Sequence, residues 1–168
     1  MTASAHSLRR RIRWVLAFFI AALAVSGLTA FPLQLELDAL VAARGAHAFG
    51  AAHGTLDWWI LTVRNGLGVT YRDYPWMGYG TDWLAFAHLV IALFFVGAWR
   101  DPVRNVWLLT AGLIACVGVI PLAMICGAIR GIPFYWRLID CAFGVFGFLP
   151  LWLARRWTLR LGRMKAEG

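Results

Sequence analysis

Four long apolar runs constrain the fold of this chain more than any other feature of its sequence. They cover roughly residues 14–33, 82–99, 106–129 and 134–154. The hydrocarbon core of a bilayer is about 30 Å thick, and a helix of about 20 apolar residues crosses it. The runs therefore predict an all-α membrane protein with four transmembrane helices.

The composition and the charge support a membrane protein. Hydrophobic residues make up 61% of the chain and charged residues 14%, against about 25% charged residues in soluble domains. The length of 168 residues predicts a single membrane domain over 1–168. The net charge of +8 would suggest nucleic-acid binding in a soluble protein. Here the cations gather at the ends of the apolar runs, so we expect the lipid bilayer, and not nucleic acid, as the partner.

The first apolar run has two interpretations. "RRRIRW", the run itself and "LTA" together resemble a signal peptide that is cleaved after Ala30. The run is longer than the apolar region of about 7–15 residues in signal peptides. We therefore expect residues 1–30 to be retained as a helix, with cleavage as the alternative.

The distribution of Lys and Arg predicts the orientation. With the N-terminus in the cytoplasm, eleven of the sixteen Lys and Arg residues lie inside and five lie outside. Cytoplasmic loops of membrane proteins carry an excess of these residues. Both termini are therefore predicted to be cytoplasmic.

The connections suggest how the spans are joined. Asp101 and Pro102 are predicted to be the N-cap and the first turn of the third span, and "RGIP" at 130–133 is predicted to be a tight turn. The outer segment, roughly 34–81, is predicted to hold two interfacial amphipathic helices, over 33–49 and 55–68, with Thr55 as a possible N-cap. These helices would lie on the outer leaflet or fold over the mouth of the bundle. "VTYRDYPWMGYG" at 69–80 then reads as an aromatic belt, or alternatively as a lid or ligand-contacting loop.

Several groups capable of chemistry lie at a similar depth in the outer half of the spans. Asp140 and His88 are each about 9 Å from the outer end of their helices, and Cys141 and Cys126 lie near them. Arg137 and Asp140 are spaced i, i+3 and can form an ion pair. Arg130, on the turn, could reach Asp140 or Asp82. The candidate ligand-binding residues are therefore His88, Asp140, Arg137, Arg130, Asp82, Cys126 and Cys141.

Stripes of small residues suggest which helix faces pack together. We expect His88 and Asp140 to meet where these faces touch, whereas Asp82 lies about 120° around its helix from His88 and need not share the site. The predicted stripes are Asp140, Gly144, Gly147 and Leu151 on the fourth span, Ala85, His88 and Ala92 on the second, and Ala111, Ala115 and Gly118 on the third.

Each candidate also has a purely structural interpretation. His88 could be a hydrogen-bonded packing residue, and the Arg137–Asp140 pair could anchor its helix at the interface. Cys126 and Cys141 could form a disulfide if the outside is oxidising. The sequence has no C-x-x-C motif and no Cys/His run with zinc spacing, so no metal ligand or catalytic residue is assigned, and any cofactor is unknown.

Two stretches carry a resemblance to a known family. "YGTDWLAFAHLVIALFFVGAWRDPVRNVW" and "RGIPFYWRLIDCAFGVFGFLPLW" resemble an uncharacterised family of small bacterial four-helix membrane proteins. The resemblance implies a bacterial inner membrane and no particular activity. The chain differs from four-helix disulfide-forming quinone reductases, which carry a C-x-x-C, and from di-haem cytochrome b bundles, because His88 is the only His within an apolar run.

Three functions of different classes fit these features. The possible partners besides lipid are a larger membrane complex or, as a homo-oligomer, further copies of the chain. The first function is a non-catalytic accessory or assembly subunit of a membrane complex. The second is an outer-half binding site for a quinone, a haem or a lipid headgroup, with the outer segment as its lid. The third is an enzyme or a transporter that uses His88 and Asp140. The absence of a polar path to the inner side argues against transport. We favour the first function because of the small size, the four spans, the small-residue faces and the lack of a complete catalytic set.

Overall fold

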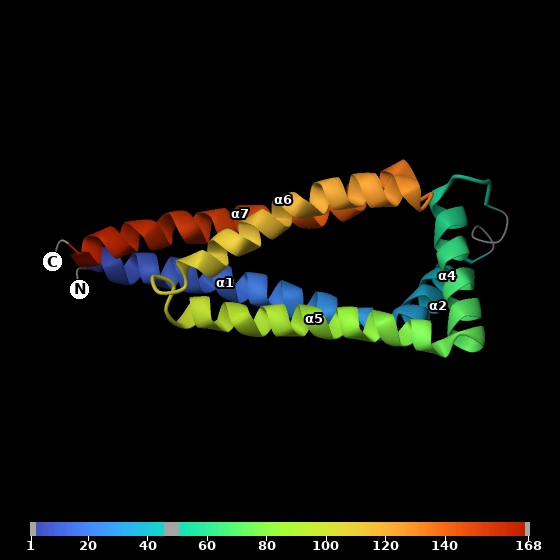
Figure 1. The fold of residues 1–168 in the computed structure, drawn as a ribbon, viewed down its shortest axis with the longest axis horizontal. Coiled ribbons are helices and arrows are strands. Elements are labelled where there is room, and N and C mark those ends of the chain that lie inside the picture. Colours follow the sequence, from blue (N-terminus) through green and yellow to red (C-terminus); the bar gives the residue numbers. More distant parts are fainter. Residues whose placement is uncertain (1–2, 46–50, 167–168) are drawn as a thin grey trace. The chain divides into compact units, whose positions relative to one another are not determined.

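The structure, a computed structural model, describes residues 3–45 and 51–166. Within these residues the chain is all α-helical (Figure 1). Four of the helices are long and apolar enough to cross a membrane, so the chain is a multi-pass membrane protein, as predicted. The helices are α1 (Ala3–Ala30), α2 (Leu33–Arg44), α4 (Leu56–Asp73), α5 (Pro75–Arg100), α6 (Val106–Ile129) and α7 (Phe134–Ala166).

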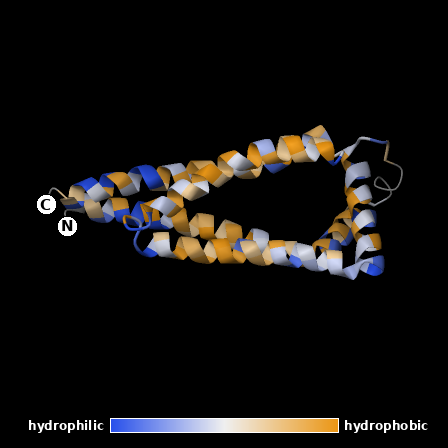
Figure 2. Ribbon diagram, in the orientation of Figure 1, coloured by the Kyte–Doolittle hydropathy of each residue, from blue (hydrophilic) through white to orange (hydrophobic). Residues whose placement is uncertain are grey.

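Three of the spanning helices are longer than their apolar runs. α1 begins at Ala3, α5 at Pro75, and α7 continues to Ala166. At 1.5 Å per residue, the 33 residues of α7 extend about 50 Å, well beyond the ~30 Å of the hydrocarbon core. Hydropathy marks the part of a helix that lipid would surround, not the residues at which the helix ends. Figure 2 shows apolar residues along the spans and polar ones at their ends.

The segment 69–80, predicted as a belt or a lid loop, is helical on both sides of a single break. α4 ends at Asp73 and α5 begins at Pro75, with Tyr74 between them at φ −138° and ψ 61°. A residue before proline is disfavoured in the helical region, whereas proline itself suits the first helical position. The segment is therefore not a loop, and its position at the level of the lipid headgroups stays a prediction.

The start of the third span differs from the prediction. α6 begins at Val106 with Asn105 as its N-cap residue. The carboxylate of Asp101 accepts from the backbone N–H of Arg104 at 3.3 Å, so it caps a turn before α6. The side-chain amide of Asn105 donates to the backbone oxygens of Gly97, at 3.1 Å, and Asp101, at 2.8 Å. These two hydrogen bonds fasten the turn to the end of α5.

Two other predicted helix ends are confirmed. Gly131 has a φ of +69°, and the N–H groups of Gly131 and Ile132 donate to the carbonyls of Ala128 and Gly127. This pattern is a Schellman motif, in which glycine adopts the left-handed conformation that ends a helix. At the start of α4, the hydroxyl of Thr55 accepts from the N–H of Trp58 at 3.3 Å and acts as the N-cap.

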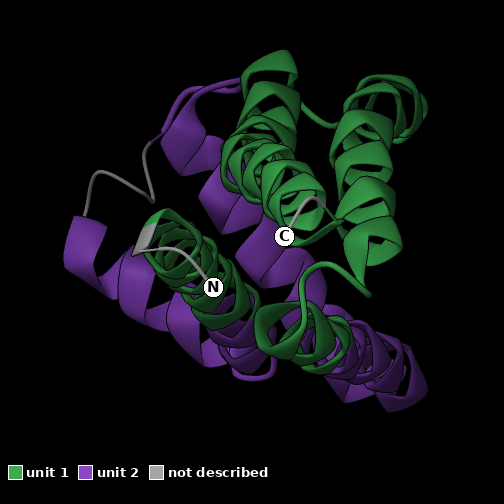
Figure 3. Ribbon diagram, turned by 90° about the vertical axis from the view of Figure 1, so that its left-hand side faces the viewer, with its two compact units in different colours: residues 1–23, 91–168 green, residues 24–90 purple. Residues whose placement is uncertain are grey.

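The chain divides into two compact units (Figure 3). Unit 1 holds residues 1–23 and 91–168, and unit 2 holds residues 24–90. α1 and α5 contribute to both units, whereas α6 and α7 lie in unit 1 and α2 and α4 in unit 2.

Unit 1 has a core to which all four of its helices contribute. The rings of Phe19 on α1 and Phe95 on α5 meet edge to face with their centroids 4.9 Å apart. Beside them, the guanidinium of Arg13 lies 5.0 Å from the ring centroid of Trp99 and donates to the carbonyl of Trp99. The buried core residues are Ala5, Ile12, Leu16, Phe95, Ala98, Leu109, Leu151, Ala154 and Leu161.

The predicted stripe on α7 is confirmed where α7 meets α6. Gly144 and Leu151 are buried. A Cβ atom at Gly144 would lie 2.5 Å from the carbonyl oxygen of Cys116, and one at Gly147 would lie 3.0 Å from the Cys116 sulfur. Only glycine permits this approach of the two backbones.

The predicted stripe on α6 is wrong. Ala115 and Gly118 are exposed, and in 3–45 and 51–166 no atom outside the local helix backbone lies within 4 Å of the place where a Gly118 Cβ would be. α6 packs instead through Leu109, Gly112 and Cys116. α6 is apolar all round, so its sequence carries no polar face from which the packed face could be inferred.

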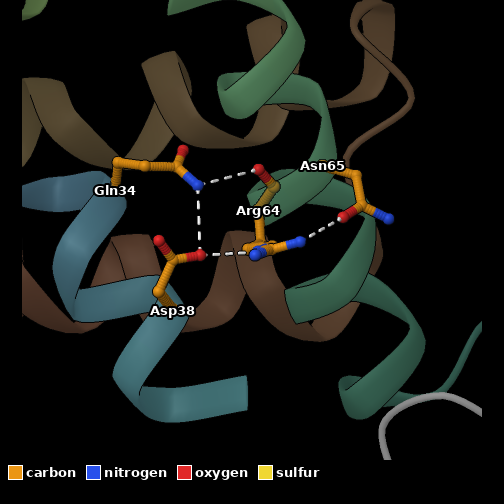
Figure 4. Close-up of polar contacts among 4 residues, drawn as sticks. All are labelled: Gln34, Asp38, Arg64 and Asn65. Atoms are coloured by element: carbon orange, nitrogen blue, oxygen red, sulfur yellow. Dashed lines mark hydrogen bonds and ion pairs between the residues drawn. The ribbon is translucent and has the colours of Figure 1, made fainter. Parts of the chain in front are cut away.

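In unit 2, polar contacts join α2 to α4. Arg64 donates to the carboxylate of Asp38 at 2.6 Å and to the side-chain oxygen of Asn65 at 3.2 Å. The amide of Gln34 donates to Asp38 at 3.3 Å and to the backbone oxygen of Arg64 at 3.4 Å (Figure 4). These contacts hold one side of α2 against α4.

A second ion pair and a small apolar contact complete the α2–α4 hairpin. Arg44, at the end of α2, pairs with Asp57 in the first turn of α4. The hydrogen bond to Asp57, with its charge, raises the pKa of the Arg44 guanidinium. Val41 and Ile60 are buried between the helices, with Leu37 and Leu61 packed against them. The end of the predicted helix 33–49 lies outside the described residues, because α2 ends at Arg44 and residues 46–50 are not described.

Candidate functional site

The predicted site residues fall in both units. Asp82 and His88 belong to unit 2, whereas Cys126, Arg130, Arg137, Asp140 and Cys141 belong to unit 1. A meeting of His88 with Asp140 therefore stays a prediction.

Arg137 binds α6 rather than a carboxylate. Its Nη1 donates to the carbonyl oxygen of Met124 at 3.4 Å, and its guanidinium lies 5.4 Å from the ring centroid of Phe134. The aliphatic stem fills the space beside Gly127, where a Cβ would lie 2.6 Å from its Cδ. This contact directs the side chain across to α6, toward carbonyl oxygens near the end of that helix. These oxygens attract a cation.

The predicted ion pair between Arg137 and Asp140 is wrong for this structure. In the described part of the chain, no carboxylate oxygen lies within 4 Å of the Arg137 guanidinium, and its buried Nε has no hydrogen-bond partner. Asp140 is half-buried. Arg130 is exposed at the C-terminal end of α6, and the described contacts include no ion pair between it and Asp140.

All three cysteines are free. Cys126 is exposed, and Cys116 and Cys141 are half-buried. The sulfur of Cys141 lies 4.0 Å from the carbonyl oxygen of Ile120. The disulfide between Cys126 and Cys141, considered as an alternative, is not formed in this structure.

His88 lies where α5 contacts α1. Its Nδ1 is 2.8 Å from the carbonyl oxygen of Leu84, so Nδ1 is the protonated, donating nitrogen. A Cβ at Gly27 of α1 would lie 3.0 Å from the Cβ of His88 and 2.9 Å from the carbonyl oxygen of Ala85. Ala85 and Ala92 are buried, so the predicted stripe on α5 is confirmed. This geometry fits a packing role for His88 beside a close α1–α5 contact.

The sequence analysis missed two adjoining hollows in unit 2. One has a volume of about 220 Å³, and the other about 410 Å³. Three residues, Phe31, Tyr79 and Asp82, line both. The first is completed by Trp83 and Phe86, and the second by Tyr71, Pro75 and Gly78. We call the two together the aromatic hollow.

One face of α5 supplies most of the wall of the aromatic hollow. The rings of Tyr79 and Trp83 have centroids 6.0 Å apart and planes at 84°, and those of Trp83 and Phe86 have centroids 6.3 Å apart and planes at 86°. Asp82 shares this face, because residues three and four apart are neighbours on a helix. The spacing 79, 82, 83, 86 is visible in the sequence. The spacing indicates one shared helix face only if the segment is helical. The predicted span began at residue 82, so this shared face was not recognised.

A polar contact fixes the rim of the aromatic hollow. The hydroxyl of Tyr71 on α4 is 3.1 Å from the hydroxyl oxygen of Thr81 on α5. The ring of Tyr71 also packs on Gly78, where a Cβ would lie 2.9 Å from it. Asp82 is half-buried, and the described contacts include no ion pair or side-chain hydrogen bond for its carboxylate. The arrangement places an anionic group among aromatic side chains.

No group of three or more His, Cys, Asp or Glu side chains that could hold a metal ion occurs within 3–45 and 51–166. Comparisons with known protein families, with curated proteins and with solved structures found no match to this chain.

Proposed function

We propose that the chain is a non-catalytic accessory or assembly subunit of a membrane complex. In this proposal it forms a single membrane domain over 1–168 in a bacterial inner membrane, with both termini in the cytoplasm. The distribution of Lys and Arg supports the orientation, and the resemblance of the sequence to small bacterial four-helix proteins supports the membrane. The protein would act by binding another membrane protein through the lipid-facing side of its spans.

The outward face of α6 is the observation that carries this proposal. Ala115 and Gly118 are exposed there, and Gly118 lies about 160° around the helix from Cys116, whose carbonyl oxygen faces Gly144 of α7. Ala111 is half-buried and lies within about 60° of both Ala115 and Gly118 around the helix. Small residues on a lipid-facing surface let the backbone of another helix approach closely. We call these three residues the α6 small-residue face.

Large apolar side chains surround the α6 small-residue face. Alternating large and small residues on one helix allow the side chains of another helix to interdigitate with them. Such packing supplies the van der Waals contact that holds helices together in lipid, where the hydrophobic effect does not. The exposed large residues are Trp107, Ile114, Leu122 and Ile125.

The proposal is tested by extracting the protein from its native membrane in mild detergent and weighing the intact assembly by native mass spectrometry. We expect the mass of a second, different protein in stoichiometric amount. Gly118→Leu fills the α6 small-residue face and should abolish co-purification of that protein. It should leave the chain folded, because no described residue outside the local helix backbone lies within 4 Å of a Cβ at this position.

Ala128→Leu is the matched control. Ala128 is also exposed on α6 but lies about 80° around the helix from Gly118, so this variant should retain the partner. A chain that is recovered alone or only with copies of itself contradicts the proposal. Equal loss of the partner in both variants contradicts the assignment of the face.

A further inference from the structure

We propose that the aromatic hollow binds an organic ammonium group, with Asp82 as the counter-ion and Tyr79, Trp83 and Phe86 as the aromatic walls. This inference goes beyond the proposed subunit role and does not depend on it. It concerns unit 2, whereas the α6 small-residue face lies in unit 1.

The aromatic walls attract a cation. The face of each ring carries negative potential, and several rings around one point form the cage that recognises quaternary ammonium groups. Trp83 lies nearly perpendicular to both Tyr79 and Phe86, so the three rings border the space in different orientations. Phe31, just after α1, lines the same space from outside α5.

The carboxylate of Asp82 fixes the sign of the ligand charge. No described cation neutralises it. Arg72, near the end of α4, is engaged with Asp73 at 2.9 Å. A half-buried carboxylate among apolar rings is stabilised by a cation of low hydration, because such a cation is easily transferred from water.

The ligand chemistry favours an organic cation over a metal ion. Ca²⁺ takes six to eight oxygen ligands, whereas the residues that line the aromatic hollow include one carboxylate, Asp82. The nearby hydroxyl of Tyr71 is already bonded to Thr81. The smaller hollow, about 220 Å³, lies below the range of about 300–1,000 Å³ for drug-sized ligands. It therefore suits a single ammonium headgroup.

Choline is the probe for this site. We would titrate choline into the full chain in maltoside micelles and follow saturation transfer from the protein to its trimethylammonium protons by NMR, with empty micelles as the blank. The neutral isostere 3,3-dimethyl-1-butanol has the same shape without the charge. We expect saturable binding of choline, and binding of the isostere weaker by about tenfold or more.

Variants locate the binding. Asp82→Asn keeps the shape of the side chain and should weaken choline binding about tenfold or more, and Trp83→Ala should do the same. Asp73→Asn and Trp76→Ala change the same residue types outside the aromatic hollow and should bind as the unchanged chain does. Trp83→Phe keeps an aromatic ring at this position. If Trp83→Ala loses affinity for choline because the ring is missing, Trp83→Phe should retain most of that affinity.

The ligand could be a free ammonium compound or the headgroup of a zwitterionic lipid, and vesicles separate the two. If choline binds equally well in phosphatidylcholine and phosphatidylglycerol vesicles, the site takes a free ligand. If phosphatidylcholine alone suppresses choline binding, the lipid headgroup occupies it. Equal binding of choline and its neutral isostere, or unchanged binding in Asp82→Asn, overturns the proposal.

Discussion

Gly144 and Gly118 are both helical glycines within apolar spans, but their surroundings differ completely. Gly144 faces the carbonyl oxygen of Cys116, whereas no described residue of another helix lies within 4 Å of a Cβ at Gly118. The residue type alone does not distinguish them. The sequence therefore predicted correctly that small residues mark contacts, and failed only in choosing which of them on α6 make the contact.

The two glycines allow a direct comparison. In Gly144→Ala the new Cβ would lie 2.5 Å from a backbone oxygen, and helices α6 and α7 must move apart, at a cost of about 1–3 kcal/mol. In Gly118→Ala the new methyl group meets no described atom beyond the local helix backbone, and the lower backbone entropy of alanine in the unfolded chain stabilises the helix by up to about 1 kcal/mol.

Thermal unfolding of both variants in detergent, followed by circular dichroism, measures this difference. We expect a lower Tm for Gly144→Ala and an unchanged or higher Tm for Gly118→Ala. The opposite order would show that α6 and α7 do not pack through Gly144.

The helices and turns show which parts of the fold could be predicted from local sequence. The four apolar spans, the N-cap at Thr55 and the glycine turn at 130–133 can each be recognised from a short stretch of sequence, and all are confirmed. The start of α6 was misplaced, because Asp101 caps a turn rather than the helix. The junction at Tyr74 was not predicted, because a single proline interrupts the helix there and no loop intervenes. The aromatic hollow was not predicted as a consequence.

In the α2–α4 hairpin, the contribution of apolar burial can be compared with that of ion pairing, because both join the two helices. The side chains of Asp38 and Arg64 are each 39% exposed, and ion pairs with this exposure contribute at most about 1 kcal/mol. Ile60 is only 5% exposed, and truncating a buried isoleucine costs about 2 kcal/mol or more.

Hydrogen exchange of the α2 amides measures the opening of the hairpin. Ile60→Ala should speed this exchange by more than tenfold, and Asp38→Asn by less, since 1.4 kcal/mol corresponds to a factor of ten. Faster exchange in Asp38→Asn than in Ile60→Ala would show that the polar contacts dominate.

At the scale of the whole molecule, the contribution of the ends of α1 and α7 to the buried core of unit 1 was not predicted. The sequence analysis searched for function where ionisable residues interrupt the apolar runs. The buried core of unit 1 instead includes Ala5 and Ile12 near the start of α1 and Leu161 near the end of α7, among the arginines that were counted only as topology signals. An arginine can cover apolar surface with its stem while its charge stays in water, so a basic segment and a packed core coexist. The local sequence of a helix does not indicate which helix, distant along the chain, will pack against it.

The fold described above requires the chain to cross the membrane four times. Single-cysteine labelling measures on which side of the membrane each connection lies. In a background with Cys116, Cys126 and Cys141 replaced by alanine, one cysteine is introduced at a time and treated with a membrane-impermeant maleimide on intact cells and then on opened cells. The account predicts that Ser7→Cys, Arg104→Cys and Lys165→Cys react only after opening, and that Ala39→Cys and Arg130→Cys react on intact cells. If Arg104→Cys and Arg130→Cys label from the same side, or if Ser7→Cys and Lys165→Cys label from opposite sides, the four-span account is contradicted.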